Sequence, residues 1–224
     1  MSEPKQFHDA TRKQESLLAP IERVCLNWLA RRTPEWIGPD HLTLLGFAAM
    51  LLAGASYAQA RWWPPSLLVV NLWLAVNWLG DSLDGTLARV RNRLRPRYGF
   101  YVDHMVDSFG ALFLLSGLAF SGFMAERVAL ALLVAFLLLS INTYLATYTM
   151  GVFHLSFWKF SPTEMRILLA IGNAYALARP DVTVFGGRYR FFDVAGASAV
   201  AVMAVALVTS VALNTITLYR AEKI

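Results

Sequence analysis

The chain alternates between long apolar runs and short stretches that are polar or contain proline and glycine. A helix needs about 20 apolar residues to cross the ~30 Å hydrocarbon core of a bilayer. Six segments approach or exceed that length, the fifth being the shortest; they lie at residues 41–60, 66–88, 99–122, 127–152, 162–177 and 194–218. The pattern therefore predicts an all-α integral membrane protein with six transmembrane helices.

The N-terminal part divides into two. Residues 1–16 are polar and lack the apolar core of a signal peptide, so we expect a polar tail there. From residue 17 to about 32, apolar side chains such as Ile21, Val24 and Trp28 recur at helical spacing over a stretch too short to span a bilayer. This predicts an amphipathic helix in the membrane interface, with a soluble helix packed on the bundle as the alternative. No repeat or linker divides residues 17–224, so we expect one membrane domain.

Composition and charge sharpen this interpretation. With 57% hydrophobic and 16% charged residues, the chain is too apolar for a soluble domain of this size. If the N-terminus is cytoplasmic, fifteen of the 20 Lys and Arg residues fall on the cytoplasmic side, which predicts that both termini are inside. The net charge of +5 then reflects topology and anionic lipid headgroups rather than nucleic-acid binding. The single cysteine excludes an intrachain disulfide and a cysteine-rich metal site.

Four aspartates stand where two predicted helices meet a short basic loop. Asp81 and Asp84 share one face near the end of the second apolar segment, and Asp103 and Asp107 share one face near the start of the third. We expect the two helices to be antiparallel neighbours with facing acidic stripes. Carboxylates at membrane depth are costly unless compensated. All-oxygen coordination suits Mg²⁺, Mn²⁺ or Ca²⁺ rather than zinc, and two such ions would balance the four charges.

Small residues flank these acids. Gly85, Ala88 and Gly99 carry little or no side chain and would leave room for a ligand against the backbone. Arg89 can bind a phosphate bidentately. Because paired metal ions commonly clamp phosphate oxygens, the segment predicts a site for a nucleotide pyrophosphate at the cytoplasmic membrane surface.

Eight positions form one pattern, Asp81-x2-Asp84-Gly85-x2-Ala88-Arg89-x9-Gly99-x3-Asp103-x3-Asp107. It resembles the signature of the CDP-alcohol phosphotransferases, six-helix membrane enzymes of phospholipid synthesis. The stretch between Arg89 and Gly99 is one residue longer than is usual in that family, at a point where the chain leaves the membrane. Asp40 also stands where the family often has Asn.

The resemblance implies a function and a set of roles. Asp81, Asp84 and Asp103 would be ligands of Mg²⁺ or Mn²⁺, and Asp107 a partial ligand that acts chiefly as general base. Gly85, Ala88 and Gly99 would form the wall for the cytidine, and Arg89 would be the partner of the diphosphate. The reaction would transfer a substituted phosphate, most simply phosphatidyl from CDP-diacylglycerol, to an acceptor hydroxyl with release of CMP. The family also suggests a homodimer with its active site facing the cytoplasm.

Other interpretations remain open from the sequence. Asp-His-x2-Asp-Ser at residues 103–108 resembles the choline and ethanolamine phosphotransferases, which use a soluble CDP-alcohol and a diacylglycerol acceptor; there His104 would assist proton transfer or play a structural role. Membrane acids can also line a cation-dependent transporter, and membrane prenyltransferases use aspartate-bound Mg²⁺. Neither of these two classes explains Gly85, Ala88 and Arg89 at their spacing.

Residues at the start of the fifth segment are candidates for contact with the acceptor. Lys159 and Arg166 would suit a phosphorylated acceptor, whereas Glu164 would suit a cationic aminoalcohol. These charges are equally well explained as those of an ordinary cytoplasmic connection between two transmembrane helices.

Overall fold

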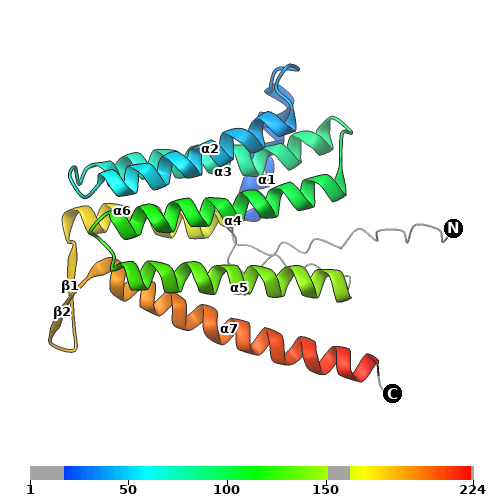
Figure 1. Cartoon of the computed structure of the whole chain (residues 1–224). Helices are drawn as coiled ribbons and strands as arrows, with labels where there is room; N and C mark the ends of the chain where they lie inside the picture. The colour runs from blue at the N-terminus through cyan, green and yellow to red at the C-terminus, as the bar shows by residue number, and fades with distance from the viewer. Residues whose placement is uncertain (1–17, 151–161, 223–224) are drawn as a thin grey trace.

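In the computed structural model, residues 18–150 and 162–222 are described, and they form helices joined by short connections and one β-hairpin (Figure 1). In chain order the elements are α1 Ala19–Arg32, α2 Pro39–Gln59, α3 Ser66–Val90, α4 Pro96–Phe120, α5 Glu126–Met150, α6 Pro162–Ala178, β1 Asp181–Val184, β2 Gly187–Arg190 and α7 Phe191–Ala221. Each predicted apolar segment is helical, with ends displaced by a few residues. The expectation of an all-α membrane protein is thereby met, apart from the hairpin.

Among the residues that the structure describes, five helices are long and apolar enough to cross a membrane, judged by length and composition: α2, α3, α4, α5 and α7. Within the described residues α6 has 17 residues, which is about 26 Å at ~1.5 Å rise per residue. It corresponds to the shortest of the six predicted apolar segments. Pro39 and Pro96 occupy the first turns of α2 and α4, where a missing backbone N–H removes no helical hydrogen bond.

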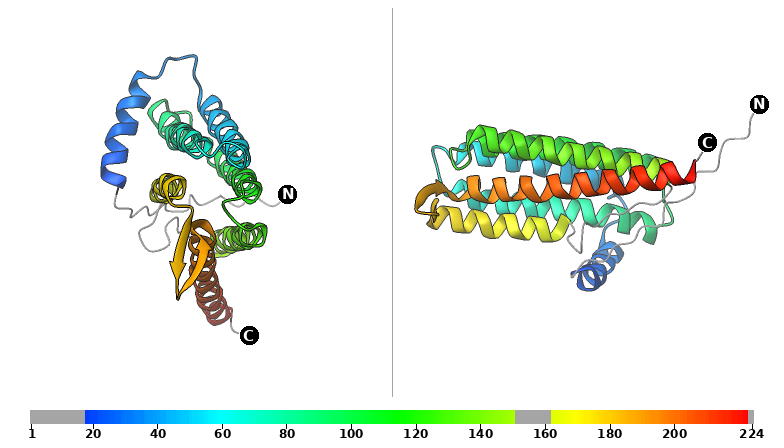
Figure 2. Two further views of the ribbon diagram at one scale, coloured as in Figure 1. Left: turned by 90° about the vertical axis from the view of Figure 1, so that its left-hand side faces the viewer. Right: turned by 90° about the horizontal axis from the view of Figure 1, so that it is seen from below.

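The long helices run roughly side by side, and α1 lies across them (Figure 2). Helix α2 packs extensively on both α3 and α4, whereas α3 and α4 make little direct contact with each other. Helix α6 packs on α3, and α5 packs on α4 and α7. The acidic stripes predicted to face each other thus belong to helices that are joined mainly through α2.

Glycines allow α2 to approach both of its neighbours. A Cβ atom added at Gly117 of α4 would lie 2.0 Å from the carbonyl oxygen of Gly54, and one added at Gly80 of α3 would lie 2.6 Å from that of Leu42. The helix backbones thus touch where no side chain stands between them, as small residues permit in membrane proteins. Gly196 of α7 plays a similar part against Val128 of α5, where an added Cβ would lie 2.7 Å from Val128 Cγ1.

Helix α1 turns one face to the bundle. Leu26 and Ala30 are buried against Leu83 and Leu87 of α3. The apolar residues that recur at helical spacing on the rest of this helix, Ile21, Val24, Cys25 and Trp28, are exposed. The segment therefore packs on the protein and still presents an apolar outer surface.

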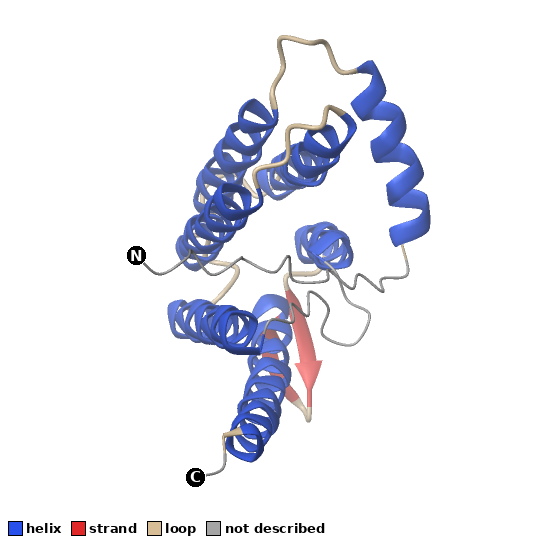
Figure 3. Ribbon diagram, turned by 90° about the vertical axis from the view of Figure 1, so that its right-hand side faces the viewer, coloured by secondary structure: helices blue, strands red, loops and turns tan. Residues whose placement is uncertain are grey.

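The long connection between α6 and α7 forms an antiparallel hairpin, seen as the strands of Figure 3. Val184 pairs with Gly187, so the loop has two residues, Phe185 and Gly186. Both have positive φ, 50° and 81°, as in the type I′ turns that match the twist of hairpin strands.

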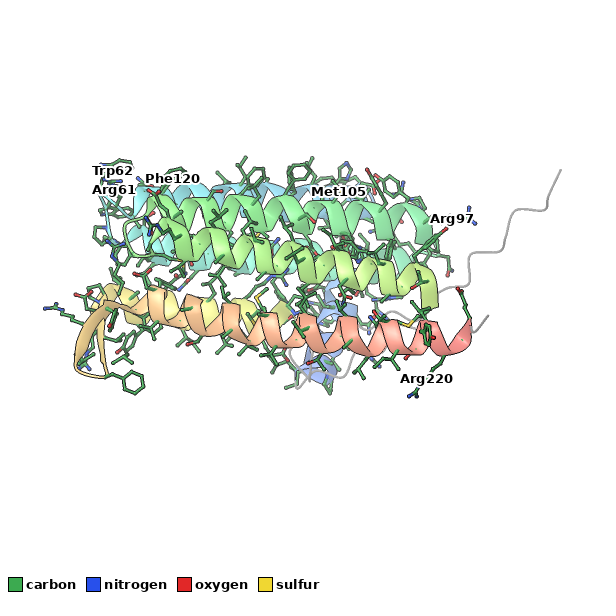
Figure 4. All side chains as sticks on the ribbon, turned by 60° about the horizontal axis from the view of Figure 1, so that its bottom comes forward. Arg61, Trp62, Arg97, Met105, Phe120 and Arg220 are labelled. Carbon is green, nitrogen blue, oxygen red and sulfur yellow. The ribbon has the colours of Figure 1, made fainter. Side chains whose placement is uncertain are left out.

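The two ends of the bundle carry different connections. Figure 4 places Arg61, Trp62 and Phe120 at one end and Arg97 and Arg220 at the other. The α3–α4 connection with its arginines and the end of α7 thus share one end, as the sequence predicts for segments on the same side of a membrane.

The close contact at Gly117 yields a first prediction. Gly117→Ala should lower the free energy of unfolding by about 1–3 kcal/mol, because its methyl group meets the backbone of α2 and the helices must separate. The measurement is thermal unfolding in detergent, followed by tryptophan fluorescence. Gly85→Ala is the matched control, since an added Cβ at Gly85 meets no atom within 4 Å. Equal unfolding temperatures for both variants would contradict the packing described.

Candidate active site

The four predicted acids come from the end of α3 and the beginning of α4, at the end of the bundle that carries Arg97. Asp107 interacts electrostatically with Asp81, Asp84 and Asp103, so the fold brings the charges of both helices together. Because α3 and α4 each pack on α2 rather than on one another, the carboxylates meet across a region that the two backbones do not close.

Each acid of α3 has a partner from a different helix. Asp84 Oδ2 accepts a 2.6 Å hydrogen bond from Thr43 Oγ1 of α2. Asp81 Oδ2 lies 2.6 Å from the guanidinium of Arg166 on α6. Neither partner is close to the acids in sequence, and both contacts depend on how the helices pack.

Asp107 remains accessible although protein surrounds it on most sides. Asp81, Asp84 and Asp103 are half-buried. A small hydrated ion can therefore reach the carboxylates without the helices unfolding.

The glycines near the acids differ from those between the helices. A Cβ atom added at Gly85 or at Gly99 would meet nothing within 4 Å, so neither residue is required for helix packing. Glycine inside a helix costs about 0.5–1 kcal/mol relative to alanine. The open space over Gly85 and Gly99 offers a surface on which a flat ligand group can lie against the backbone.

The other two residues predicted for nucleotide binding lie differently. Ala88 is buried, with 8% of its surface exposed, so its methyl group mainly serves packing. Arg89 is exposed at the end of α3 and donates to Thr86 Oγ1 at 3.2 Å. Its guanidinium stands at the surface where a phosphate could meet it.

The donor set fits a hard divalent cation. Four carboxylates lie close enough to repel one another, and all-oxygen ligands suit Mg²⁺ or Mn²⁺. In the described part of the chain, no three acidic, histidine or cysteine side chains already converge on one metal position. Asp81 is turned toward Arg166 and Asp84 toward Thr43, so coordination requires these side chains to reorient.

His104 lies in an aromatic group beside the acids. Its Nδ1 is 2.6 Å from the carbonyl oxygen of Phe100, and its ring lies 4.1 Å from the Phe100 ring and 4.5 Å from that of Tyr144. These contacts fit the structural role left open by the sequence.

Tyr144 of α5 was not identified from the sequence. Its ring lies 4.5 Å from that of His104, and it interacts electrostatically with Asp107 and Asp103. A tyrosine within a long apolar run gives no signal of its own, because only the packing of α5 on α4 brings it to the acids.

The residues proposed to contact the acceptor lie in different parts of the structure. Arg166 joins the acids, whereas Glu164 is buried and accepts a 3.3 Å hydrogen bond from the backbone N–H of Leu18, before α1. Lys159 lies outside the described residues. The polar residues Asn71 and Asn77 bind neighbouring helices, donating to the carbonyl oxygens of Ala170 and Gly46.

Comparison with curated proteins finds relatives of one kind of enzyme. The chain is 29% identical to cholinephosphotransferase 1 of Bos taurus over 174 residues, covering 73% of this chain and 42% of the relative. It is 28% identical to cholinephosphotransferase 1 of Gallus gallus over 197 residues, covering 81% and 57%. It is 29% identical to the archaetidylinositol phosphate synthase of Pyrococcus horikoshii over 114 residues, covering 50% and 53%.

The chain thus matches about half the length of these relatives, and no protein-family profile matches it. Both kinds of relative are CDP-alcohol phosphotransferases. The resemblance that the aspartate pattern indicates is therefore confirmed, and by sequence this chain is similar to the CDP-alcohol phosphotransferase family.

Proposed function

We propose that this protein transfers a substituted phosphate from a CDP-linked donor to the hydroxyl of an alcohol, releasing CMP, in phospholipid biosynthesis. The observation that carries the proposal is the convergence of four carboxylates beside two uncovered glycines at one end of a membrane bundle. The names of the relatives support the same reaction class. A cation transporter would use the acids but gives no reason for the open space over Gly85 and Gly99.

The acids would hold the cofactor. Asp81, Asp84 and Asp103, with Asp107 as a partial ligand, would bind Mg²⁺ or Mn²⁺ as two ions, as the resemblance to the family implies. When bound, the ions would neutralise charge on the diphosphate during the displacement. Arg89 would add a bidentate contact to a diphosphate oxygen at the membrane surface.

Asp107 would act as general base. Its carboxylate would accept the proton of the acceptor hydroxyl, whose oxygen forms a bond to the phosphorus that carries the donor alcohol. The bond between that phosphorus and the oxygen bridging to CMP breaks, and CMP leaves with the electron pair. Because Asp107 is accessible at the end of the bundle where the four acids converge, an acceptor hydroxyl can reach its carboxylate.

The glycines would set the nucleotide position. The cytidine would lie over Gly85 and Gly99, where a side chain would otherwise occupy the same space. Ala88, being buried, would keep the end of α3 packed next to this surface. His104 would hold the first turns of α4 through Phe100, with a secondary role in proton transfer.

The membrane arrangement is part of the proposal. Helix α6 would be the sixth span and α1 would lie in the cytoplasmic interface with Trp28 outward. Both termini and the active site would face the cytoplasm, supported by the arginines at the acid-bearing end of the bundle. Residues 17–224 would form one domain, preceded by a polar tail, and the protein would act as a homodimer.

Two donors are to be distinguished. The sequence favours phosphatidyl transfer from CDP-diacylglycerol, whereas the relatives named cholinephosphotransferase and the Asp-His-x2-Asp-Ser stretch favour a soluble CDP-alcohol with a diacylglycerol acceptor. Glu164 and Arg166 do not decide between the two donors, because both are bound to other parts of the protein. Lys159 lies outside the described residues. Purified protein given each donor with a panel of acceptors should yield a lipid product identifiable by mass.

The role of Asp107 gives a second prediction. Asp107→Asn should lower the rate of CMP release by about 10²-fold or more, because a positioned base typically contributes that much. The measurement is CMP release by purified protein in detergent with Mg²⁺ or Mn²⁺ and the better donor. Asp181→Asn, in the hairpin, is the matched control and should retain the wild-type rate. Wild-type turnover by the Asp107 variant would remove the basis of the assignment.

The open space over Gly85 gives a third prediction. Gly85→Ala should leave the unfolding temperature unchanged or raise it, because alanine favours the helix and meets no atom. The same change should raise the KM for the CDP donor about tenfold, through loss of roughly 1.4 kcal/mol of binding. Steady-state kinetics and thermal unfolding on one preparation test both halves. An unchanged KM would show that the nucleotide does not lie over this residue.

A further inference from the structure

Arg166 reaches from α6 into the group of carboxylates. One of its terminal nitrogens lies 2.6 Å from Asp81 Oδ2, and its Nε donates a 2.8 Å hydrogen bond to Asn77 Oδ1. Asn77 and Asp81 are one helical turn apart on α3, so a single planar guanidinium contacts both. Only an arginine side chain offers two donors in this fixed geometry.

Neighbouring hydrogen bonds position the Arg166 guanidinium. Asn77 donates its Nδ2 to the carbonyl oxygen of Gly46 at 3.0 Å, which orients its Oδ1 toward Arg166. Helix α6 is separately fixed to the bundle by Asn173, which accepts from Tyr57 and donates to Asn71, both at 2.7 Å. Arg166 therefore reaches Asp81 from a helix whose position does not depend on the ion pair.

The ion pair of Arg166 and Asp81 is partly buried. The exposed fractions are 16% for the Arg166 side chain and 25% for that of Asp81. Arg166 also attracts Asp107 electrostatically, so its charge acts on acids of both helices. It is the protein's own cation at a place where four carboxylates meet.

A metal ion on Asp81 would lie within a few ångströms of the guanidinium, whichever of the two carboxylate oxygens it took. Asp81 Oδ2, bound here by the guanidinium, belongs to the first acid of the predicted ligand set. A carboxylate contacting a guanidinium and a divalent ion together would bring two cationic groups within a few ångströms, where they repel strongly. The two contacts of this carboxylate are therefore competitors.

We propose that Arg166 is an exchangeable counter-ion, which holds Asp81 in the metal-free protein and is displaced from it when a divalent cation binds. This inference rests on the proposed function only in taking Asp81 as a metal ligand. The exchange has two consequences. Arg166 stabilises the metal-free protein by compensating a carboxylate near the membrane, and it weakens metal binding because its contact with Asp81 must first be broken.

The experiment measures binding of Mn²⁺ alone, without nucleotide, to purified wild type, Arg166→Gln, Asp81→Asn and Arg220→Gln. Free Mn²⁺ is followed by its electron paramagnetic resonance signal, and thermal unfolding is recorded with and without the metal. Arg220→Gln is the matched control, since this exposed arginine lies near the end of α7.

Arg166→Gln should bind Mn²⁺ about tenfold more tightly than wild type, because no charge-assisted contact to Asp81 has to be broken before the metal binds. Without metal it should unfold at a lower temperature than wild type, and saturating Mn²⁺ should reduce that difference. Asp81→Asn should bind more weakly, and Arg220→Gln should match wild type. Equal or weaker Mn²⁺ binding by Arg166→Gln would overturn the exchange, because Arg166 would then accompany or support the metal.

Arg166→Lys provides a second test of the exchange if Arg166→Gln does not fold. Lysine retains the charge but cannot contact Asn77 and Asp81 with one planar fork. It should bind Mn²⁺ several-fold more tightly than wild type, and binding equal to or weaker than wild type would reject the exchange. Failure of wild type to bind Mn²⁺ at all would instead contradict the metal-dependent function, which separates the two conclusions.

Discussion

The helix arrangement of this protein has to offset the free-energy cost of placing carboxylates near a bilayer. An acid at membrane depth costs several kcal/mol unless it has a partner, and this bundle brings four of them to one end. Their partners come from other helices: Thr43 of α2 binds Asp84, and Arg166 of α6 binds Asp81. A helix arrangement that supplied the acids without these partners would be unstable in the metal-free state. The positions of α2 and α6 are therefore tied to the chemistry of α3 and α4.

Helix α2 meets this constraint by standing between the two acid-bearing helices. Its glycine contacts with α3 and α4 bring the backbones together near Gly80 and Gly117, and α3 and α4 have little contact with each other. The acids of α3 and α4 nevertheless interact electrostatically. Tight packing in one place thus leaves an accessible carboxylate, Asp107, in another. Packing and ligand access are achieved by different glycines of the same helices.

Local features of this fold could be predicted from sequence, and its cross-helix contacts could not. The helical segments follow from the length and spacing of apolar residues, and Asp81, Asp84, Asp103 and Asp107 follow from helical geometry within each segment. Arg166, Tyr144 and Glu22 have roles that arise between helices; Glu22, for example, accepts from Trp78 Nε1 at 2.8 Å and from Thr163 Oγ1 at 2.9 Å. Periodicity within one helix carries no information on which neighbour it meets. For the same reason the apolar spacing of α1 follows from the sequence, whereas the packing of Leu26 and Ala30 on α3 does not.

The two kinds of glycine illustrate what the structure adds to a motif. In the sequence, Gly80 and Gly85 are equivalent small residues on one helix, and either can be explained by close packing. An added Cβ at Gly80 would meet the backbone of α2, whereas one at Gly85 would meet nothing within 4 Å. Helix packing accounts for the first and leaves the second without a structural reason, although glycine weakens a helix. A ligand lying over Gly85 supplies that reason. The nearby carboxylates of α3 and α4 favour a ligand that binds together with divalent cations, such as a diphosphate.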